Sequence, residues 1–396
     1  MTATPVLAPG PQDFYQVRAL LPAEDRALLA RVRTFMEEQV EPIINRYWTR
    51  AEFPFQLIEP WAALGLGGLA YEGYGCPGKT FLLDGLVAME TARVDSSFAT
   101  FHGVHSGLAM GSIYLAGSEE QKERWLPPMA RFEKIGAFGL TEPDVGSGAA
   151  RGLTTTARRD GDAWVLDGQK KWIGNAPFAD VTVIWARDVH DGEVKGFLVE
   201  KGTPGVSVET LGDKIALRVV QNGLISLVGV RVPESHRLQK ATGFRATADV
   251  LRMTRAGVAW QAVGCALGAY EIALAYAGRR AQFGRPIASF QLIQDLLVRM
   301  LGNITAGQCL LVRLSQMQDA GVMEDHHASL AKAFCTVHMR ETVGWARELF
   351  GGNGILLEES VGRFVADAEA IYSYEGTREM NTLIVGRAIT GHSAFV

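Results

Sequence analysis

The sequence is poor in cysteine and carries little net charge, and both properties exclude classes of protein. Its 396 residues contain four cysteines and a formal net charge of −4. The cysteines lack the paired spacing of a metal site or a disulfide framework, so we expect them to be reduced core residues. The small acidic excess gives no broad attraction for nucleic acid or anionic lipid. We therefore expect no metal site and no nucleic-acid partner.

We also expect no targeting signal. A signal peptide has a basic region followed by an apolar run, and residues 1–16 contain prolines but neither of these features in that order. The chain does not end in a peroxisomal tripeptide. Residues 257–278 are nearly uncharged and long enough to cross a bilayer, but they are rich in Gly and Ala. A helix buried on nearly all sides in a bundle explains this composition better. We expect a cytoplasmic protein without a membrane span.

The chain divides into three segments that differ in the spacing of their apolar residues. Residues 22–130 show helical spacing, with Leu28, Val32 and Phe35 on one face, and Ser118 followed by acids opens another helix. Residues 135–241 hold short β-branched runs, with Asp-Gly pairs at 160, 167 and 191 that predict tight turns. Helical spacing then returns. We predict an α+β multi-domain chain: an N-terminal helical domain (1–134), a central antiparallel β domain (135–241) and a C-terminal helical bundle (242–396).

The β domain is expected to contain strands at residues 154–158, 164–166, 170–173, 181–186, 196–200 and 224–232. No helical stretch separates them, and parallel strands need long crossovers, so antiparallel pairing is predicted. Two buried helix faces are expected in the bundle, one at positions 293, 297, 300 and 304 and the other at positions 330, 334 and 337.

The stretch most suggestive of chemistry is residues 372–379, Tyr-Ser-Tyr-Glu-Gly-Thr-Arg-Glu. Its central acid, Glu375, lies between Tyr374 and a Gly-Thr pair. Gly376 lets the backbone bend closely around a ligand, and aromatic neighbours shield a carboxylate and raise its pKa. This is the setting of a general base. An ordinary loop with a solvated glutamate fits the same eight residues.

Four other stretches have features of a binding site. Residues 138–147 form a glycine-bearing loop with hydroxyls where helices give way to strands. Trp172 and Gly174 end a strand, so the indole is either a core ring or a surface for a flat cofactor. Residues 279–286 offer arginines that suit either a phosphate group or the helix dipole. Residues 351–354 close a helix with glycines, as many helices do. His102 and His105 lack a third metal ligand.

In this order and at these separations, the five stretches resemble the acyl-CoA dehydrogenase family. Residues 90–96, 214–223 and 386–391 extend the likeness from residue 22 to the C-terminus. Within the family, the chain resembles glutaryl-CoA dehydrogenases and plant short-chain acyl-CoA oxidases. The resemblance implies a homotetramer with one FAD per subunit and a role in fatty acid metabolism. It also implies an acyl-CoA substrate, a trans-2-enoyl-CoA product, and electron-transfer flavoprotein or another acceptor.

The resemblance assigns roles to individual residues. Glu375 looks like the base that removes the α-proton while a hydride leaves the β-carbon for the flavin. The residues that match CoA contacts are Ser147 and Arg255, and those expected at the acyl pocket are Phe98, Ala99, Phe101, His102 and Tyr374. The flavin contacts it implies, some of them to a neighbouring subunit's cofactor, are Phe138, Leu140, Thr141, Trp172, Arg280, Gln282, Phe283, Gly351, Gly352, Thr377 and Glu379.

The chain departs from the family pattern at several positions. Ala99 and Thr100 replace an arginine and a serine of glutaryl-CoA dehydrogenases, in which that arginine pairs with the distal carboxylate. We therefore expect a neutral, short acyl group and no decarboxylation.

Thr254 stands where a minority of the family keeps its base, and threonine cannot serve as one, which favours Glu375. Gly174 replaces a threonine that is usual in dehydrogenases and matches the plant oxidases. Direct use of oxygen with release of hydrogen peroxide therefore stays open, as does, less favourably, glutaryl-CoA oxidation. Gly148 replaces an aspartate, and the sequence gives no account of its effect.

Overall fold

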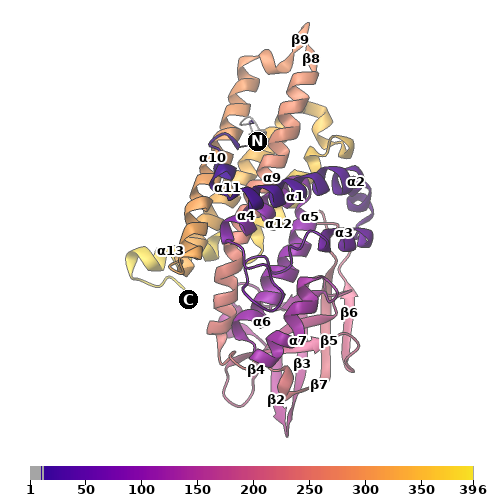
Figure 1. The fold of residues 1–396 in the computed structure, drawn as a ribbon, viewed down its shortest axis with the longest axis vertical. Helices are drawn as coiled ribbons and strands as arrows, with labels where there is room; N and C mark the ends of the chain where they lie inside the picture. The colour runs from indigo at the N-terminus through magenta and orange to yellow at the C-terminus, as the bar shows by residue number, and fades with distance from the viewer. Residues whose placement is uncertain (1–9, 11–12, 396) are drawn as a thin grey trace.

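The computed structural model describes residue 10 and residues 13–395. The prediction that residues 1–16 are not a signal peptide therefore concerns positions that lie largely outside the described part. Figure 1 shows a helical bundle standing on a curled β-sheet, with the N-terminal helices packed along the side of the bundle. The order of helical, β and helical domains that the sequence predicts is confirmed.

Short helices make up the N-terminal domain. Leu28, Val32 and Phe35 are buried together, as predicted. Ser118 caps its helix reciprocally with Gln121, because each side chain accepts a hydrogen bond from the other residue's backbone N–H. The elements are η2 (Val17–Leu20), α1 (Ala23–Phe35), η3 (Met36–Val40), α2 (Glu41–Arg50), η4 (Phe55–Leu57), α3 (Ile58–Ala62), α4 (Phe81–Val94), α5 (Ser96–His102), η5 (Gly103–Ala109), α6 (Met110–Ala116) and α7 (Glu119–Ala130).

The β domain forms one sheet in the order β1-β4-β2-β3-β7-β6, with β5 paired to β4. Antiparallel pairing is confirmed for β2–β3, β3–β7, β4–β5 and β6–β7. It is wrong for β1–β4 and β2–β4, which are parallel. The elements are β1 (Gly136–Gly139), α8 (Ala149–Gly152), β2 (Thr156–Asp160), β3 (Ala163–Gly174), β4 (Val181–Asp188), β5 (Val194–Glu200), β6 (Val206–Thr210), β7 (Asn222–Pro233) and η6 (Glu234–His236).

Two of the three Asp-Gly pairs form turns between strands, at Gly161 and Gly192. The turn predicted at Gly168 is wrong, because the strands expected on either side of it merge into β3. Gly168 lies at an irregularity of that strand with a φ of 142°, and a Cβ there would come within 2.7 Å of Thr155. Asp-Gly here marks a bulge and a close backbone approach.

The C-terminal bundle is organised around α9, whose small residues let α4 approach closely. A Cβ on Gly264 or Gly268 would overlap the backbone carbonyl of Met89 or Arg93. The elements are α9 (Phe244–Arg279), β8 (Ala281–Gln282), β9 (Arg285–Pro286), η7 (Ile287–Ser289), α10 (Gln291–Asp319), α11 (Asp325–Leu349), η8 (Gly351–Ile355), η9 (Leu357–Glu359), α12 (Val361–Ser373) and α13 (Arg378–Thr390).

Both α9 and α10 are long and apolar enough to cross a membrane by length and composition alone. In α9, 78% of the apolar window is buried within the protein, so the prediction of a helix enclosed by its neighbours is confirmed. In α10, 39% of the apolar window is buried. Leu292 and Val298 are among the apolar side chains of this helix that lie on the surface.

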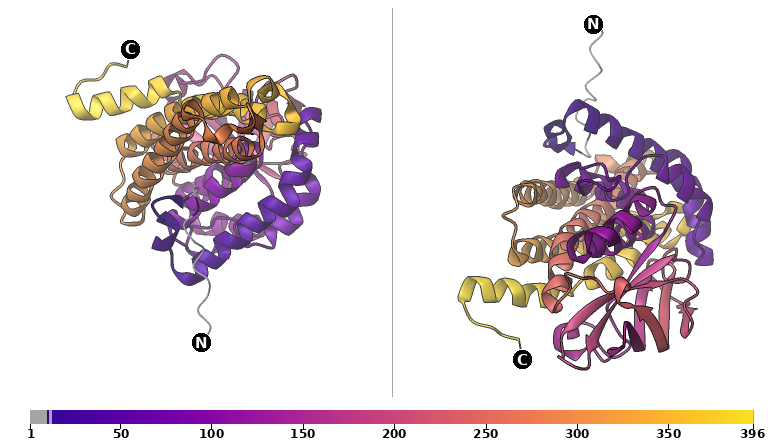
Figure 2. Two further views of the ribbon diagram at one scale, coloured as in Figure 1. Left: turned by 90° about the horizontal axis from the view of Figure 1, so that it is seen from above. Right: turned by 60° about the horizontal axis from the view of Figure 1, so that its bottom comes forward.

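The buried face predicted for α11 is wrong. Leu330 is 51% exposed, whereas the smaller Ala328, Ala331 and Cys335 pack inward. Small side chains pack here because α9 and α11 lie close together. The face predicted for α10 is confirmed at positions 297, 300 and 304. Figures 1 and 2 show that α13 extends away from the bundle, and Asn381 alone of its described residues is buried.

The four cysteines form no disulfide, as the sequence predicts. Cys265 and Cys335 are core residues, and Cys76 is partly buried. Cys309 is exposed, so the expectation that all four lie in the core is wrong for this residue.

Candidate active site

Glu375 lies in a strained turn between α12 and α13. Its φ is 52°, and that of Gly376 is 91°. A left-handed backbone costs a non-glycine residue roughly 1–2 kcal/mol, so the surroundings must hold the turn in place. Lys332 Nζ donates to the Gly376 carbonyl at 2.6 Å, and Asn381 Nδ2 donates to the same oxygen at 2.9 Å. Thr377 then caps α13 through the Met380 N–H at 3.3 Å.

The Glu375 carboxylate has the environment of a general base. Thr254 on α9 donates its hydroxyl to Glu375 Oε2 at 2.6 Å. Burial raises the pKa of Glu375 above its ordinary value, while Thr254, Lys332 and Arg255 oppose that rise. A carboxylate with a raised pKa accepts a proton more readily. Thr254 therefore supports Glu375 and does not replace it.

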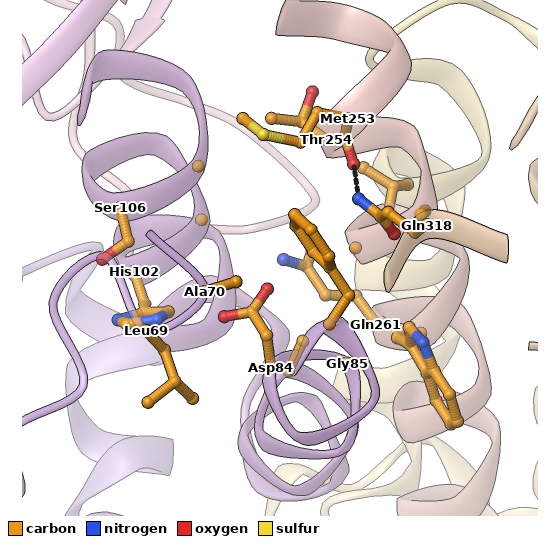
Figure 3. A pocket seen from close by; sticks show the side chains of 18 of the residues that line it. Leu69, Ala70, Asp84, Gly85, His102, Ser106, Met253, Thr254, Gln261 and Gln318 are labelled. Atoms are coloured by element: carbon orange, nitrogen blue, oxygen red, sulfur yellow. Dashed lines mark hydrogen bonds between the residues drawn. The ribbon is translucent and has the colours of Figure 1, made fainter. Parts of the chain in front are cut away.

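A cavity lies between α4, the α5–η5 segment and α9 (Figure 3), and Glu375 is among the residues that line it. Glycines on η5 keep it open. A Cβ on Gly107 would stand 3.2 Å from Thr254 Cγ2, and one on Gly103 would stand 3.0 Å from Gln261 Nε2. The η5 segment is a π-helix, a form that often occurs at functional sites.

The two histidines of the α5–η5 segment are neutral. Trp61 Nε1 donates to His102 Nδ1 at 3.2 Å, and burial lowers the pKa of His102 to about 3. His105 Nδ1 accepts from the Gly136 N–H at 3.0 Å, and its Nε2 donates to the Met129 carbonyl at 2.9 Å. Burial lowers its pKa to about 4. His102 lines the cavity, as predicted, whereas His105 ties η5 to β1.

Four of the predicted flavin contacts gather where β1 and β3 end. Phe138 and Leu140 are buried, and Thr141 exchanges hydrogen bonds with Lys171 through its hydroxyl (2.7 Å) and carbonyl (2.9 Å). The next residue, Trp172, leaves 57% of its surface exposed and has a φ of 66°. A large ring held out by an unusual backbone is a natural platform for a flat ligand.

A buried ion pair fixes this corner of the sheet. Lys170 Nζ lies 2.9 Å from Glu142 Oε1, and both side chains are almost fully buried. Burial lowers the pKa of Lys170 to about 8, although Glu142 opposes the shift. Lys170 also donates to the Leu140 carbonyl at 3.0 Å.

The sheet corner adjoins the cavity through η5. A Cβ on Gly174, at the end of β3, would stand 3.1 Å from Val104 Cγ2. Val104 lies beside Gly103, which lines the cavity from the other side. The η5 segment therefore links the end of β3 to the cavity wall.

The remaining predicted flavin contacts lie elsewhere. The β8–β9 hairpin, which holds Gln282 and Phe283, forms the tip of the bundle opposite the sheet (Figure 1). Phe283 is 92% exposed with a φ of 52°. Gly351 and Gly352 open η8, which is tied to α9 by Asn353 Nδ2 donating to Tyr276 Oη at 3.0 Å. One chain therefore does not bring Arg280, Gln282, Phe283, Gly351 and Gly352 to the sheet corner.

Three other predicted residues are close to Glu375 or follow it. Arg255 Nε donates to the Glu375 carbonyl at 3.4 Å, and its Nη1 pairs with Asp325 at 3.0 Å. Tyr374 donates its hydroxyl to Gln261 Oε1 at 2.6 Å. Glu379 is exposed and pairs with Arg378 at 2.8 Å.

The structure does not place every predicted pocket residue on the cavity. Phe98 is fully buried, with ring centroids 5.2 Å from Trp61 and 6.3 Å from Phe35, and it forms no part of the cavity wall. Ala99 lies behind the wall and accepts a hydrogen bond from Gln261 at 3.4 Å. Ser147 is exposed in the loop after β1. Phe98 packs in the aromatic core because the face of α5 that carries it points toward α1 and α3.

Sequence reasoning missed Asp84, Gln261 and Lys332. All three are polar residues on helices that are otherwise largely buried. Asp84 and Gln261 line the cavity, and Lys332 fixes the turn after Glu375. The sequence signal that could have found them is a polar residue on an apolar helix face. That signal does not identify the cavity that the residue faces.

Comparisons with known proteins assign all three domains. Residues 22–133, 137–230 and 241–390 match the families described as the acyl-CoA dehydrogenase N-terminal, middle and C-terminal domains. The chain is 33% identical to a 3-(aryl)acrylate reductase of Clostridium sporogenes (strain ATCC 15579), covering 89% of this chain and 95% of that protein.

Solved structures agree with this assignment. A glutaryl-CoA dehydrogenase from Mycobacterium smegmatis is 40% identical with a TM-score of 0.94, covering 98% of this chain and 100% of that one. A structure of a glutaryl-CoA dehydrogenase from the same organism in complex with FADH2 is 37% identical with a TM-score of 0.94, covering 98% and 99%. Butyryl-CoA dehydrogenase from Megasphaera elsdenii is 30% identical with a TM-score of 0.89, covering 93% and 98%.

Proposed function

This chain belongs to the acyl-CoA dehydrogenase family of FAD-dependent oxidoreductases, and on that premise we propose that it oxidises a neutral, short acyl-CoA to the trans-2-enoyl-CoA. The observation that carries the proposal is Glu375. It lines the cavity, accepts a hydrogen bond from Thr254 at 2.6 Å, and has a raised pKa. In this role Glu375 takes the α-proton of the thioester.

The sheet corner fits FAD. Trp172 offers an open aromatic face, and Thr141 beside it offers a hydroxyl and backbone groups. Bound there, FAD supplies the hydride acceptor for the β-carbon. The chain's own part is to hold the acyl group between η5 and α9 and to present Glu375 in a fixed turn.

A neutral acyl group is favoured by the charges of the cavity. The charged residues in its wall are two acids, Asp84 and Glu375, and the wall contains no Arg or Lys among the residues that the structure describes. A distal carboxylate would be left unpaired and repelled. Ala99, the position at which glutaryl-CoA dehydrogenases are expected to carry arginine, is 2% exposed and too small to reach the cavity.

The separated flavin contacts support an oligomer in which subunits complete one another's site. We expect a homotetramer in solution, and Phe283→Asp should reduce both the assembled fraction and the FAD bound per chain severalfold. Light scattering and flavin absorbance measure the two quantities. Val189→Asp, at an exposed turn of the sheet, is the matched control and should change neither. A monomer that retains full FAD would contradict this prediction.

The electron acceptor separates a dehydrogenase from an oxidase. We propose electron-transfer flavoprotein or a similar protein acceptor. One observation favours the alternative, direct use of oxygen. Gly174 has no side chain where it packs against Val104.

A substrate panel with and without oxygen tests both points. We expect butyryl-CoA to bleach the flavin, glutaryl-CoA to be at least about tenfold slower because its carboxylate is unpaired, and reduced enzyme to reoxidise slowly in aerated buffer. Equal rates with the two thioesters would overturn the neutral-substrate proposal. Rapid, stoichiometric peroxide would instead establish the oxidase.

A further inference from the structure

The acyl cavity contains an acid that neither the base nor the cofactor contacts explain. Asp84 on α4 lies in the cavity wall, and Figure 3 shows its carboxyl group projecting from the helix into the central space. Its carboxyl group makes no hydrogen bond or ion pair with the residues that the structure describes. The side chain is only partly exposed, and a carboxylate with reduced access to water and no protein partner favours a ligand that hydrogen-bonds to it.

Asp84 lies beside a different part of α9 from the part that holds the base. Gly85, the next residue, packs so closely on Trp260 that a Cβ would overlap the indole. Trp260 is six residues beyond Thr254 on α9, and a helix rises 1.5 Å per residue, so the separation along the helix is roughly 9 Å. Thr254 holds Glu375. The carboxyl group of Asp84 therefore stands beside the distal part of a bound acyl chain.

The neighbours of Asp84 do not neutralise it. The Tyr71 hydroxyl is engaged with the Ser106 carbonyl at 2.9 Å, and Gln318 Nε2 with that of Met253 at 3.4 Å. His102 is neutral. Burial, and then the charge of Asp319, raise the pKa of Asp84 to about 6, so the group is mostly ionised at pH 7.5 and above.

We propose that Asp84 is a specificity residue that accepts a hydrogen bond from an uncharged donor, a hydroxyl or an amide N–H, on the distal part of the acyl group. The inference rests on the proposed acyl-CoA oxidation and narrows its substrate class. The preferred acyl group is longer than butyryl, because the donor must lie roughly 9 Å along α9 from Thr254, which holds Glu375. The same carboxylate repels a dicarboxylate such as glutaryl.

The test compares hexanoyl-CoA with 6-hydroxyhexanoyl-CoA at pH 8. Wild-type enzyme should favour the hydroxyacyl substrate by about tenfold or more in kcat/KM, the usual effect of a hydrogen bond to a charged group. Asp84→Leu should reverse the preference. Asp84→Asn keeps the shape without the charge and should raise kcat/KM for adipoyl-CoA about tenfold relative to hexanoyl-CoA. Asp295→Leu, on the exposed face of α10, is the matched control and should leave all ratios unchanged.

The outcomes separate this inference from the proposed function. If no acyl-CoA bleaches the flavin, both fail. The inference alone is overturned if hexanoyl-CoA is oxidised, the wild type does not favour 6-hydroxyhexanoyl-CoA over it, and Asp84→Asn does not change the ratio of kcat/KM for adipoyl-CoA to that for hexanoyl-CoA. It is also overturned if both variants lower kcat/KM for every thioester by one common factor, because Asp84 would then act on the shared CoA portion or on the fold.

Discussion

Glu375→Gln is expected to lower kcat for a saturated acyl-CoA by about 10² to 10⁴-fold, the usual contribution of a general base. The protein should stay yellow and keep its affinity for CoA thioesters. Glutamine has the shape of glutamate and still accepts the Thr254 hydrogen bond, but it cannot take the α-proton. Stopped-flow bleaching of the flavin measures the chemical step, and thioester titration measures binding.

The control for this substitution is Glu358→Gln, at an exposed position of η9. It removes one negative charge without touching the cavity and should leave turnover unchanged. Turnover of Glu375→Gln within a fewfold of wild type would remove Glu375 from the mechanism. Loss of the flavin from the variant would instead show that the turn after α12 supports cofactor binding.

The turn that carries the proposed base could be predicted from the sequence because its setting is local. Glu375, Gly376 and Thr377 follow one another, and the structure uses each as the pattern suggests, as carboxylate, left-handed turn and helix cap. The domain order was equally accessible, because periodicity changes abruptly near residues 135 and 242.

Other features depend on contacts between distant segments. Asp84 meets the cavity only because glycines let α4 pack on α9, and nothing near it in the sequence signals a ligand. The parallel β1–β4 and β2–β4 pairs escaped prediction because the β2–β3 hairpin itself carries the chain back across the sheet. The strand β1 (Gly136–Gly139) has no alternating pattern, since all four residues are buried.

Lys332→Met is expected to lower kcat/KM about tenfold or more at pH 6 to 7 and to move the acidic limb of its pH profile to higher pH. Lys332 is fully buried and is the cation that holds the Gly376 carbonyl at 2.6 Å. Its charge also opposes the burial that raises the pKa of Glu375. Without it the pKa of Glu375 rises further, and less of the ionised base exists at a given pH.

The shape of the pH profile distinguishes this electrostatic effect from a structural one. Burial lowers the pKa of Lys332 to about 8, so above that pH the wild type also loses the cation and the two profiles should converge. Lys214→Met is the control, because Lys214 is a partly buried lysine whose pKa is likewise lowered to about 8. It donates to the Leu217 and Val220 carbonyls and not to the turn after Glu375. The Lys214→Met substitution should lower the Tm without moving the acidic limb of the pH profile. A uniform loss across pH in Lys332→Met would show that the lysine only holds the turn, and the pKa of Glu375 would then be set by burial, Thr254 and Arg255.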